Sequence, residues 1–199
     1  MLRSLCLNFA LPAVIGLSVA VVVWRRSHAP PPPKLEQISA ETLLAHAAVS
    51  DQQNEKVVLV EFGDLQCPAC AMVNPMVREV VQRRHLGYVF RNFPLTSIHP
   101  FARPLAIRTL ALPPEARLAE MAKVWEQPLP PTEELGKQIQ KLPADSRVAA
   151  ETLLDRDVAI ATSLGLHATP TFYICLNGRE VWRLFTVGQV EEFLDERRL

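Results

Sequence analysis

VVLVEFGDLQCPACAMVNP, residues 57–75, joins an apolar run to a helical pattern through two cysteines that are two residues apart. The run 57–62 is too short and too rich in β-branched residues for a helix, so it predicts a buried central strand. A helix is expected over about 67–84, with a kink at Pro75, which removes a backbone hydrogen bond. Cys67 then stands at the N-terminus of this helix, where unpaired N–H groups and the helix dipole stabilise a thiolate. The pattern is typical of a thiol–disulfide exchange site.

Half of a zinc ribbon is the alternative interpretation of this cysteine pair. A structural zinc site needs four ligands, which a second pair usually completes. The remaining cysteines, Cys6 and Cys175, are single and far apart, and the histidines lack the spacing of zinc ligands. Redox chemistry is therefore favoured, and neither a metal nor an organic cofactor is expected.

Length and composition fit one globular domain with appendages. The chain has 199 residues, 49% of them hydrophobic and 21% charged, which allows a proper core. The 21 basic and 21 acidic residues cancel. This balance gives no electrostatic argument for nucleic acid as a partner.

Residues 1–28 are predicted to be an N-terminal membrane anchor. No charged residue occurs between Ser4 and Trp24, and a helix of this length extends about 30 Å, enough to cross a bilayer. Trp24 beside two arginines is typical of an interfacial anchor. A cleaved signal peptide is the alternative, with Ser18-Val19-Ala20 as a weak cleavage site.

The orientation of this anchor follows from two conflicting signals. Arg25 and Arg26 outnumber Arg3, which favours a cytoplasmic C-terminal part. A tethered cysteine exchanger, however, suits an oxidising compartment. We therefore expect the catalytic domain on the extracytoplasmic side, which is the periplasm in a bacterium. A proline-rich linker, residues 29–36, would hold the domain off the membrane as a stiff spacer.

The rest of the chain, residues 37–199, reads as one domain with a helical insertion at about 100–145. Ser39 is expected to cap a helix, and Asn177-Gly178 predicts a β-hairpin turn. The other expected elements are, in order, a helix at 40–48, a strand at 88–93, short helices between 100 and 142, a helix at 146–164, hairpin strands at 171–176 and 179–184, and a helix at 190–198.

This order of elements is that of an α/β thioredoxin fold with a helical insertion, preceded by a transmembrane helix. The segments VEFGDLQCPACAMVNPMV, YVFRNFPL, IHP and GLHATPTFYICLNGR resemble the membrane-anchored or secreted thioredoxin-fold proteins of the DsbA-like family. The resemblance covers about residues 35–199. It implies that Pro75 marks the helix kink, that Thr169-Pro170 is the cis-proline loop facing the disulfide, and that Glu61 is the buried acid.

The two cysteines have different expected roles. Cys67 is interpreted as the exposed nucleophile and Cys70 as the buried resolving thiol, one helical turn deeper. Pro68 fixes φ in the first turn, where no N–H is needed. Ala69 gives no hydrogen bond to the Cys67 sulfur, whereas strongly oxidising DsbA-like proteins carry histidine there. This difference predicts a milder oxidant.

Glu61 lies in an apolar strand, where burial should raise its pKa and suit it to proton transfer with Cys70. The alternative is a strand-end glutamate that reaches solvent. A cis bond at Thr169-Pro170 would expose the Thr169 backbone to an extended substrate, and an ordinary trans proline is the alternative. Asp64 is expected to cap the loop or the helix.

Other candidate residues receive structural interpretations. His99 could approach the site, but a cap on the following helix is the favoured interpretation. Cys175 is expected to be a core thiol. The aromatic residues at strand spacing are expected to be core as well; they are Phe90, Phe93, Phe172 and Tyr173.

The sequence therefore predicts a thiol–disulfide oxidoreductase that acts on cysteine-containing protein substrates and promotes disulfide formation. A reductase or isomerase is an alternative, and so is a non-catalytic thioredoxin-fold binding or chaperone module. The oxidase direction requires a quinone-linked membrane partner, whereas the opposite direction requires an electron donor.

Overall fold

The computed structural model describes residues 29–47, 49–51 and 54–199. The chain divides into two units, Met1–Pro32 and Pro33–Leu199, and the fold below is that of the second unit. The predicted membrane anchor, residues 1–28, lies outside the described residues. Within the described ranges, no helix is both long and apolar enough to cross a bilayer.

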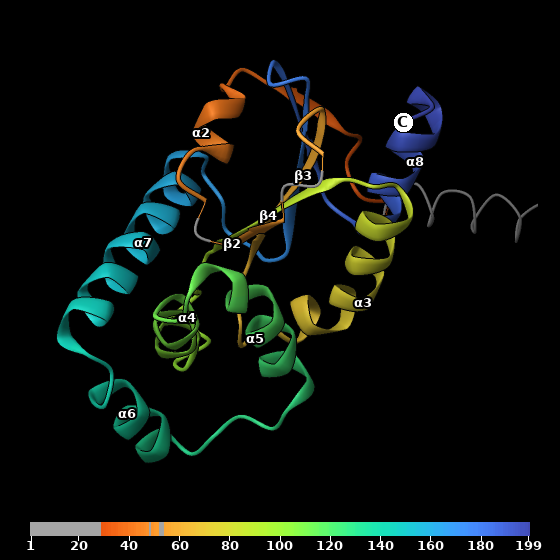
Figure 1. The fold of residues 1–199 in the computed structure, drawn as a ribbon. Helices are drawn as coiled ribbons and strands as arrows, with labels where there is room; N and C mark the ends of the chain where they lie inside the picture. Colours follow the sequence, from red (N-terminus) through yellow and green to blue (C-terminus); the bar gives the residue numbers. More distant parts are fainter. Residues whose placement is uncertain (1–28, 48, 52–53) are drawn as a thin grey trace, which may run out of the picture. The chain divides into compact units, whose positions relative to one another are not determined.

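A six-stranded mixed sheet forms the centre of this unit, in the order β1-β6-β5-β3-β4-β2 (Figure 1). The central strand β3 (Val57–Gly63) is parallel to β4 (Gly87–Asn92) and antiparallel to β5 (Thr171–Leu176). Every residue of these three strands is buried, as expected for a sheet with helices on both faces. The predicted central strand is confirmed, and its carboxyl end leads into the cysteine pair.

The predicted hairpin near the C-terminus is also confirmed. Strand β6 (Glu180–Leu184) pairs antiparallel with β5. Asn177 and Gly178 have φ values of 51° and 66°, the left-handed conformation that a two-residue turn of this type requires.

The two outer strands of the sheet were not predicted. Strand β1 (Lys34–Glu36) pairs antiparallel with β6, and β2 (Val49–Asp51) pairs antiparallel with β4. The predicted linker, residues 29–36, is therefore wrong at its C-terminal end, because Lys34–Glu36 belongs to the sheet. A strand of three residues is too short to show an alternating pattern, and its backbone partners come from a distant part of the chain.

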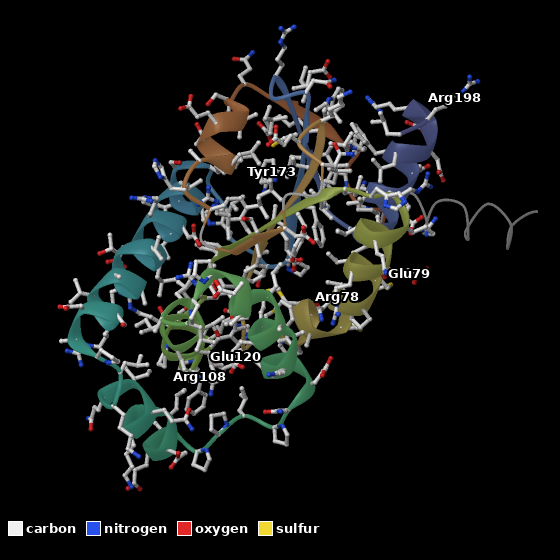
Figure 2. All side chains as sticks on the ribbon, in the orientation of Figure 1. Arg78, Glu79, Arg108, Glu120, Tyr173 and Arg198 are labelled. Carbon is white, nitrogen blue, oxygen red and sulfur yellow. The ribbon has the colours of Figure 1, made fainter. Side chains whose placement is uncertain are left out.

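Two hydrophobic cores cover the two faces of the sheet. One contains apolar side chains of α3 (Pro68–Arg83), α8 (Val187–Arg197) and the insertion helices. The other contains apolar side chains of α2 (Ala40–Leu44) and of the C-terminal half of α7 (Ala144–Ser163). Tyr173, labelled in Figure 2, lies in this second core, with its ring edge-on to Phe62 at 5.8 Å. All four aromatic residues predicted as core are buried.

Three short helices form the predicted insertion: α4 (Ala102–Leu110), α5 (Pro114–Glu126) and α6 (Thr132–Gln140). Arg108 of α4 joins them, because its guanidinium lies 3.1 Å from Glu120 of α5 and 3.1 Å from the Gln138 side chain of α6. Figure 2 shows Arg108 and Glu120 side by side between their helices. The longer helix predicted for 146–164 is α7, which is followed by Gly165 at a φ of 63°.

Arg91 of β4 is a buried charge that the sequence analysis did not single out. Its guanidinium lies 2.8 Å from Asp157 of α7, and both side chains are almost fully buried. The remaining N–H groups donate to the backbone oxygens of Leu43 and Ala45, where α2 ends. The helix predicted for 40–48 is therefore shorter than expected, because its last carbonyls bind Arg91 instead of continuing the helix. Its predicted cap is present, since the Ser39 side chain accepts from the Thr42 N–H.

Candidate active site

Cys67 lies where the chain passes from β3 to α3, as predicted. It is the N-cap residue of α3, and Pro68 occupies the first turn. The Cys67 N–H donates to the Asp64 backbone oxygen at 3.0 Å, and the Cys67 carbonyl accepts from the Ala71 N–H. The sulfur therefore stands at the N-terminal end of a 16-residue helix, where the dipole favours negative charge.

The loop at Thr169-Pro170 comes from a distant part of the chain and lies against Cys67. The Thr169-Pro170 peptide bond is cis, as the resemblance implied. The Cys67 thiol donates to the Thr169 carbonyl oxygen at 3.6 Å. Cys67 is only 6% exposed, so the expectation of an exposed thiol is wrong. The low exposure of Cys67 goes together with the contact between its thiol and the Thr169 carbonyl oxygen.

Cys70 lies one turn deeper in α3 and is fully buried. Burial raises the pKa of this thiol well above its ordinary value; the Asp64 N–H, 3.5 Å from the sulfur, opposes the shift, and the negative charge of Glu61 adds to it. The Thr169 hydroxyl lies close enough to lower the pKa slightly, although no hydrogen bond of ordinary length joins it to a described residue. Cys70 therefore needs a proton acceptor before it can react as a thiolate.

Glu61 is a buried acid whose negative charge acts on the Cys70 thiol. It is fully buried on β3, and burial raises its pKa from 4.5 to about 7, while a hydrogen bond from Tyr88 partly opposes the shift. The Tyr88 hydroxyl donates to Oε2 at 2.8 Å. Oε1 is also buried, and no residue in the described part of the chain hydrogen-bonds to it. The alternative of a solvent-reaching glutamate is wrong.

Gly63 lies close to the Phe90 ring and to the carboxyl group of Glu61. A Cβ at position 63 would lie 2.3 Å from the Phe90 ring and 3.3 Å from Oε1 of Glu61. Any larger residue would therefore push into the ring or toward the carboxyl. The close approach explains why a glycine stands between the acid and the cysteines.

His99 approaches the active-site loop, which was the alternative that the sequence left open. His99 does not cap the following helix, because α4 has Phe101 as its N-cap and no side-chain cap bond. Its Nδ1 atom lies 2.8 Å from Oδ2 of Asp64 instead. Asp64 caps the loop, as expected, by accepting from the Gln66 N–H at 2.7 Å. The only local signal was the proline after His99, because the residue before a proline is disfavoured in a helix and marks a boundary between elements.

The remaining predicted site residues lie in the helix α3 and in the strand β5. Ala69 lies in the first turn of α3 and is partly exposed, and Pro75 lies inside the same helix. Cys175 is buried on β5, and burial raises the pKa of its thiol to about 12. Cys67, Cys70 and Cys175 are free thiols. Over residues 29–47, 49–51 and 54–199, no group of three or more His, Cys, Asp or Glu could hold a metal ion.

The chain is similar in sequence to a known protein family and to several known proteins. A protein-family model described as thioredoxin matches residues 51–196. The Na(+)/H(+) antiporter NhaA 1 of Salinispora arenicola is 33% identical over an alignment of 135 residues; the match covers 62% of this chain and 20% of the antiporter. NhaA 1 of Mycolicibacterium gilvum is 31% identical over an alignment of 147 residues, and the match covers 66% of this chain and 23% of the antiporter. The chain thus spans about a fifth of the length of these curated relatives.

Several solved structures have a similar fold. Pseudomonas aeruginosa DsbA2 has a TM-score of 0.58 at 22% identity, over 74% of this chain and 91% of that protein. The catalytic domain of Proteus mirabilis ScsC has a TM-score of 0.60 at 19% identity, over 78% and 92%. Bacillus subtilis BdbD has a TM-score of 0.58 at 18% identity, over 83% and 98%. At these identities the likeness is one of fold, and it agrees with the resemblance drawn from the sequence.

Proposed function

The chain belongs to the thioredoxin family, whose model covers residues 51–196, and from this we propose that it is a thiol–disulfide oxidoreductase with Cys67 and Cys70 as its redox pair. The placement of Cys67 carries the proposal. Its sulfur stands at the N-terminus of α3, 3.6 Å from the Thr169 carbonyl of the cis-proline loop. Cys70 is buried one turn behind it.

The reaction is a pair of thiol–disulfide exchanges. A substrate thiolate attacks Cys67 Sγ of the Cys67–Cys70 disulfide; a mixed disulfide forms, and Cys70 leaves as a thiolate. Protonated Glu61 gives Cys70 its proton, because the Cys70 thiol has the higher pKa. A second substrate thiolate then attacks the substrate sulfur of the mixed disulfide and releases Cys67. Two electrons pass to the cysteine pair, and the substrate gains one disulfide.

The proposed substrates are proteins that contain cysteine, and the proposed direction is disulfide formation. An extended substrate segment would pair with the backbone at Thr169, beside Cys67. Ala69 adds no hydrogen bond to Cys67, which supports a mild oxidant. If the same exchange steps run in reverse, the cysteine pair acts as a reductant or isomerase. The reduction potential of the Cys67–Cys70 pair therefore decides the direction of the reaction.

We propose that the domain works on the extracytoplasmic side of a membrane, the periplasm in a bacterium, tethered by residues 1–28. The length of the uncharged segment before Arg25 supports the tether. A quinone-linked membrane oxidase would reoxidise the cysteine pair in the forming direction. No metal or organic cofactor takes part in the proposed exchange.

The test follows oxidation of a two-thiol peptide by the full-length chain in glutathione buffer. Cys67→Ser should abolish turnover, and Cys70→Ser should trap a mixed disulfide at Cys67. Cys175→Ser is the matched control and should keep wild-type turnover, because this thiol lies on β5 in the other core. Turnover that survives in Cys67→Ser would overturn the redox pair. A reduction potential near that of thioredoxin, about −270 mV, would overturn the oxidase direction.

A further inference from the structure

A cavity of about 560 Å³ lies between α3 and α5 and reaches the outer strand β2. Its polar lining residues come from four elements: Asp51 of β2, Asn74, Arg78 and Gln82 of α3, Tyr88 of β4, and Lys123 and Glu126 of α5. Figure 2 shows Arg78 extending from α3 on the side of α5. Apolar side chains of α3 and α5 complete the lining, and the charged groups among them provide polar partners for water in the cavity.

Tyr88 connects this cavity to the buried carboxyl of the active site. It is 5% exposed and lines the cavity, while its hydroxyl donates to Oε2 of Glu61 at 2.8 Å. In the sheet it stands opposite Asp51 of β2, and directly opposite residues of paired strands face the same side. Glu61, Tyr88 and Asp51 therefore form a diagonal row that crosses the sheet from its centre to its outer strand.

The cavity also approaches the thiol that exchanges a proton with Glu61. Asn74 lines it and is buried, and it follows Cys70 by four residues in α3. Residues four apart lie on the same face of a helix. The cavity wall therefore includes neighbours of both Cys70 and Glu61.

The active site itself offers protons little access to solvent. Cys70 and Glu61 are 0% exposed, and Cys67 is 6% exposed. A protein substrate in a mixed disulfide with Cys67 would cover that remaining surface. The proton that Glu61 exchanges with Cys70 then needs another way to water.

We propose that Tyr88 is the positioning residue of Glu61, and that the cavity between α3 and α5 is the route by which Glu61 exchanges its proton with solvent during substrate turnover. The inference rests on the proposed function. The Tyr88 hydroxyl holds Oε2 and leaves Oε1 for the Cys70 proton. When the carboxyl proton stands on Oε2, the Tyr88 hydroxyl turns from donor to acceptor: its oxygen takes the Glu61 proton while its own hydrogen passes to a water in the cavity, which leaves Glu61 ionised. Tyr88 is neither charged nor consumed.

The surrounding charges agree with this role. Tyr88 from β4 is the titratable group whose hydrogen bond lowers the pKa of Glu61, and the charge of Glu61 in turn raises the pKa of Cys70 on α3. Burial, and then the charge of Glu61, raise the pKa of Tyr88 well above its ordinary value, so its hydroxyl stays a neutral donor. In the cavity, Asp51 and Glu126 are balanced by Arg78 and Lys123, which leaves no net charge to trap a proton.

The first test is a carbon-13 NMR titration of the Glu61 carboxyl in the full-length chain, assigned by Glu61→Gln. In Tyr88→Phe the midpoint should rise by about one pH unit, because a hydrogen bond that favours the ionised acid is removed. An unchanged midpoint would overturn the positioning role. This readout needs no turnover, so it stands apart from failure of the proposed function, which would appear as wild-type protein without exchange dependent on Cys67.

The second test fills the cavity and does not depend on the folding of Tyr88→Phe. Ala119 is an exposed residue of α5 that lines the cavity. Ala119→Leu should slow multiple-turnover oxidation of the two-thiol peptide several-fold at pH 7, because Glu61 must exchange its proton with solvent in every cycle. Ala149→Leu, at an exposed position of α7 outside the cavity, should match the wild type. Equal rates for the two leucine variants would overturn the cavity route.

Discussion

His99 Nδ1 lies 2.8 Å from Oδ2 of Asp64, a buried carboxylate in the loop between β3 and the cysteine pair. The same carboxylate accepts from the backbone N–H groups of Gln66 at 2.7 Å and Leu95 at 2.8 Å. The Asp64 carbonyl accepts from the Cys67 N–H. One side chain thus joins the active-site loop to the segment between β4 and α4.

Asp64→Asn should therefore lower the free energy of unfolding by about 1–3 kcal/mol, because an amide NH₂ would face N–H donors where an acceptor stood. Urea denaturation followed by circular dichroism measures the loss. Asp195→Asn is the matched control, since the Asp195 side chain is 64% exposed in its pair with Arg84; its change should stay within about 1 kcal/mol. Equal losses in both variants would contradict the role given to Asp64.

Glu61→Gln should slow resolution of the mixed disulfide by Cys70 about ten- to a hundredfold, as for a lost general base. In the wild type, the rate at which Cys70 attacks should rise with pH through about 7, because only ionised Glu61 accepts the thiol proton. The glutamine variant should lack this rise. Quenched-flow trapping between pH 5.5 and 8.5 measures it, with Cys67 alkylation as the check that the fold is intact. The same pH profile in both proteins would remove Glu61 from the mechanism.

The Glu61 carboxyl should also make the fold less stable at neutral pH than at acid pH. Its pKa is raised from 4.5 to about 7, so between these values the folded chain keeps a proton that the unfolded chain has lost. Stability therefore falls as pH rises through this window, by on the order of 3 kcal/mol in total. Glu61→Gln should remove this part of the slope in urea titrations at pH 5 and pH 8.

Glu79→Gln is the control for this stability effect. Glu79 lies on the exposed side of α3, where its side chain is 72% exposed beside Arg83 (Figure 2). This variant should keep the wild-type dependence on pH. If Glu61→Gln and Glu79→Gln gave the same slope, the raised pKa of Glu61 would be contradicted.

Asp157→Asn should destabilise the fold more than Asp64→Asn does, because it leaves the buried Arg91 guanidinium without its counter-charge. The expected loss is about 3–5 kcal/mol of unfolding free energy. Asp155→Asn removes an exposed partner of Arg103, 64% exposed, and should cost at most about 1 kcal/mol. Denaturant midpoints measure both variants, and similar midpoints would show that the buried pair does not hold α2, β4 and α7 together.

Much of the fold could be predicted because each element has a local signature. The run at 57–62, the Asn177-Gly178 turn and the prolines that begin the insertion helices determine their own conformation. The short strands β1 and β2 have no such signature, since three residues show no period. Their place depends on the edges of β6 and β4, which lie far away in the sequence.

The candidate site, like the fold, could be predicted only in part. Cys67, Cys70 and the Thr169-Pro170 loop were found from motif and resemblance. The partners of the two acids were not found, because Tyr88 reaches Glu61 from the neighbouring strand and His99 reaches Asp64 from the loop after it. Such contacts depend on strand register and loop path. The low exposure of Cys67 was missed for the same reason, since it depends on a contact with residues about a hundred positions away.

The two short outer strands determine how the sheet meets other polypeptides. Within the part of the chain that the structure describes, the sheet is bounded by three residues on each side, β1 and β2. Short edges of this kind, with Lys34 and Glu36 on one of them, resist the strand addition that leads to aggregation. An unfolded polypeptide would therefore find few backbone groups at the sheet edges with which to pair. The proposed substrate contact at the Thr169 backbone, beside Cys67, uses neither of these edges.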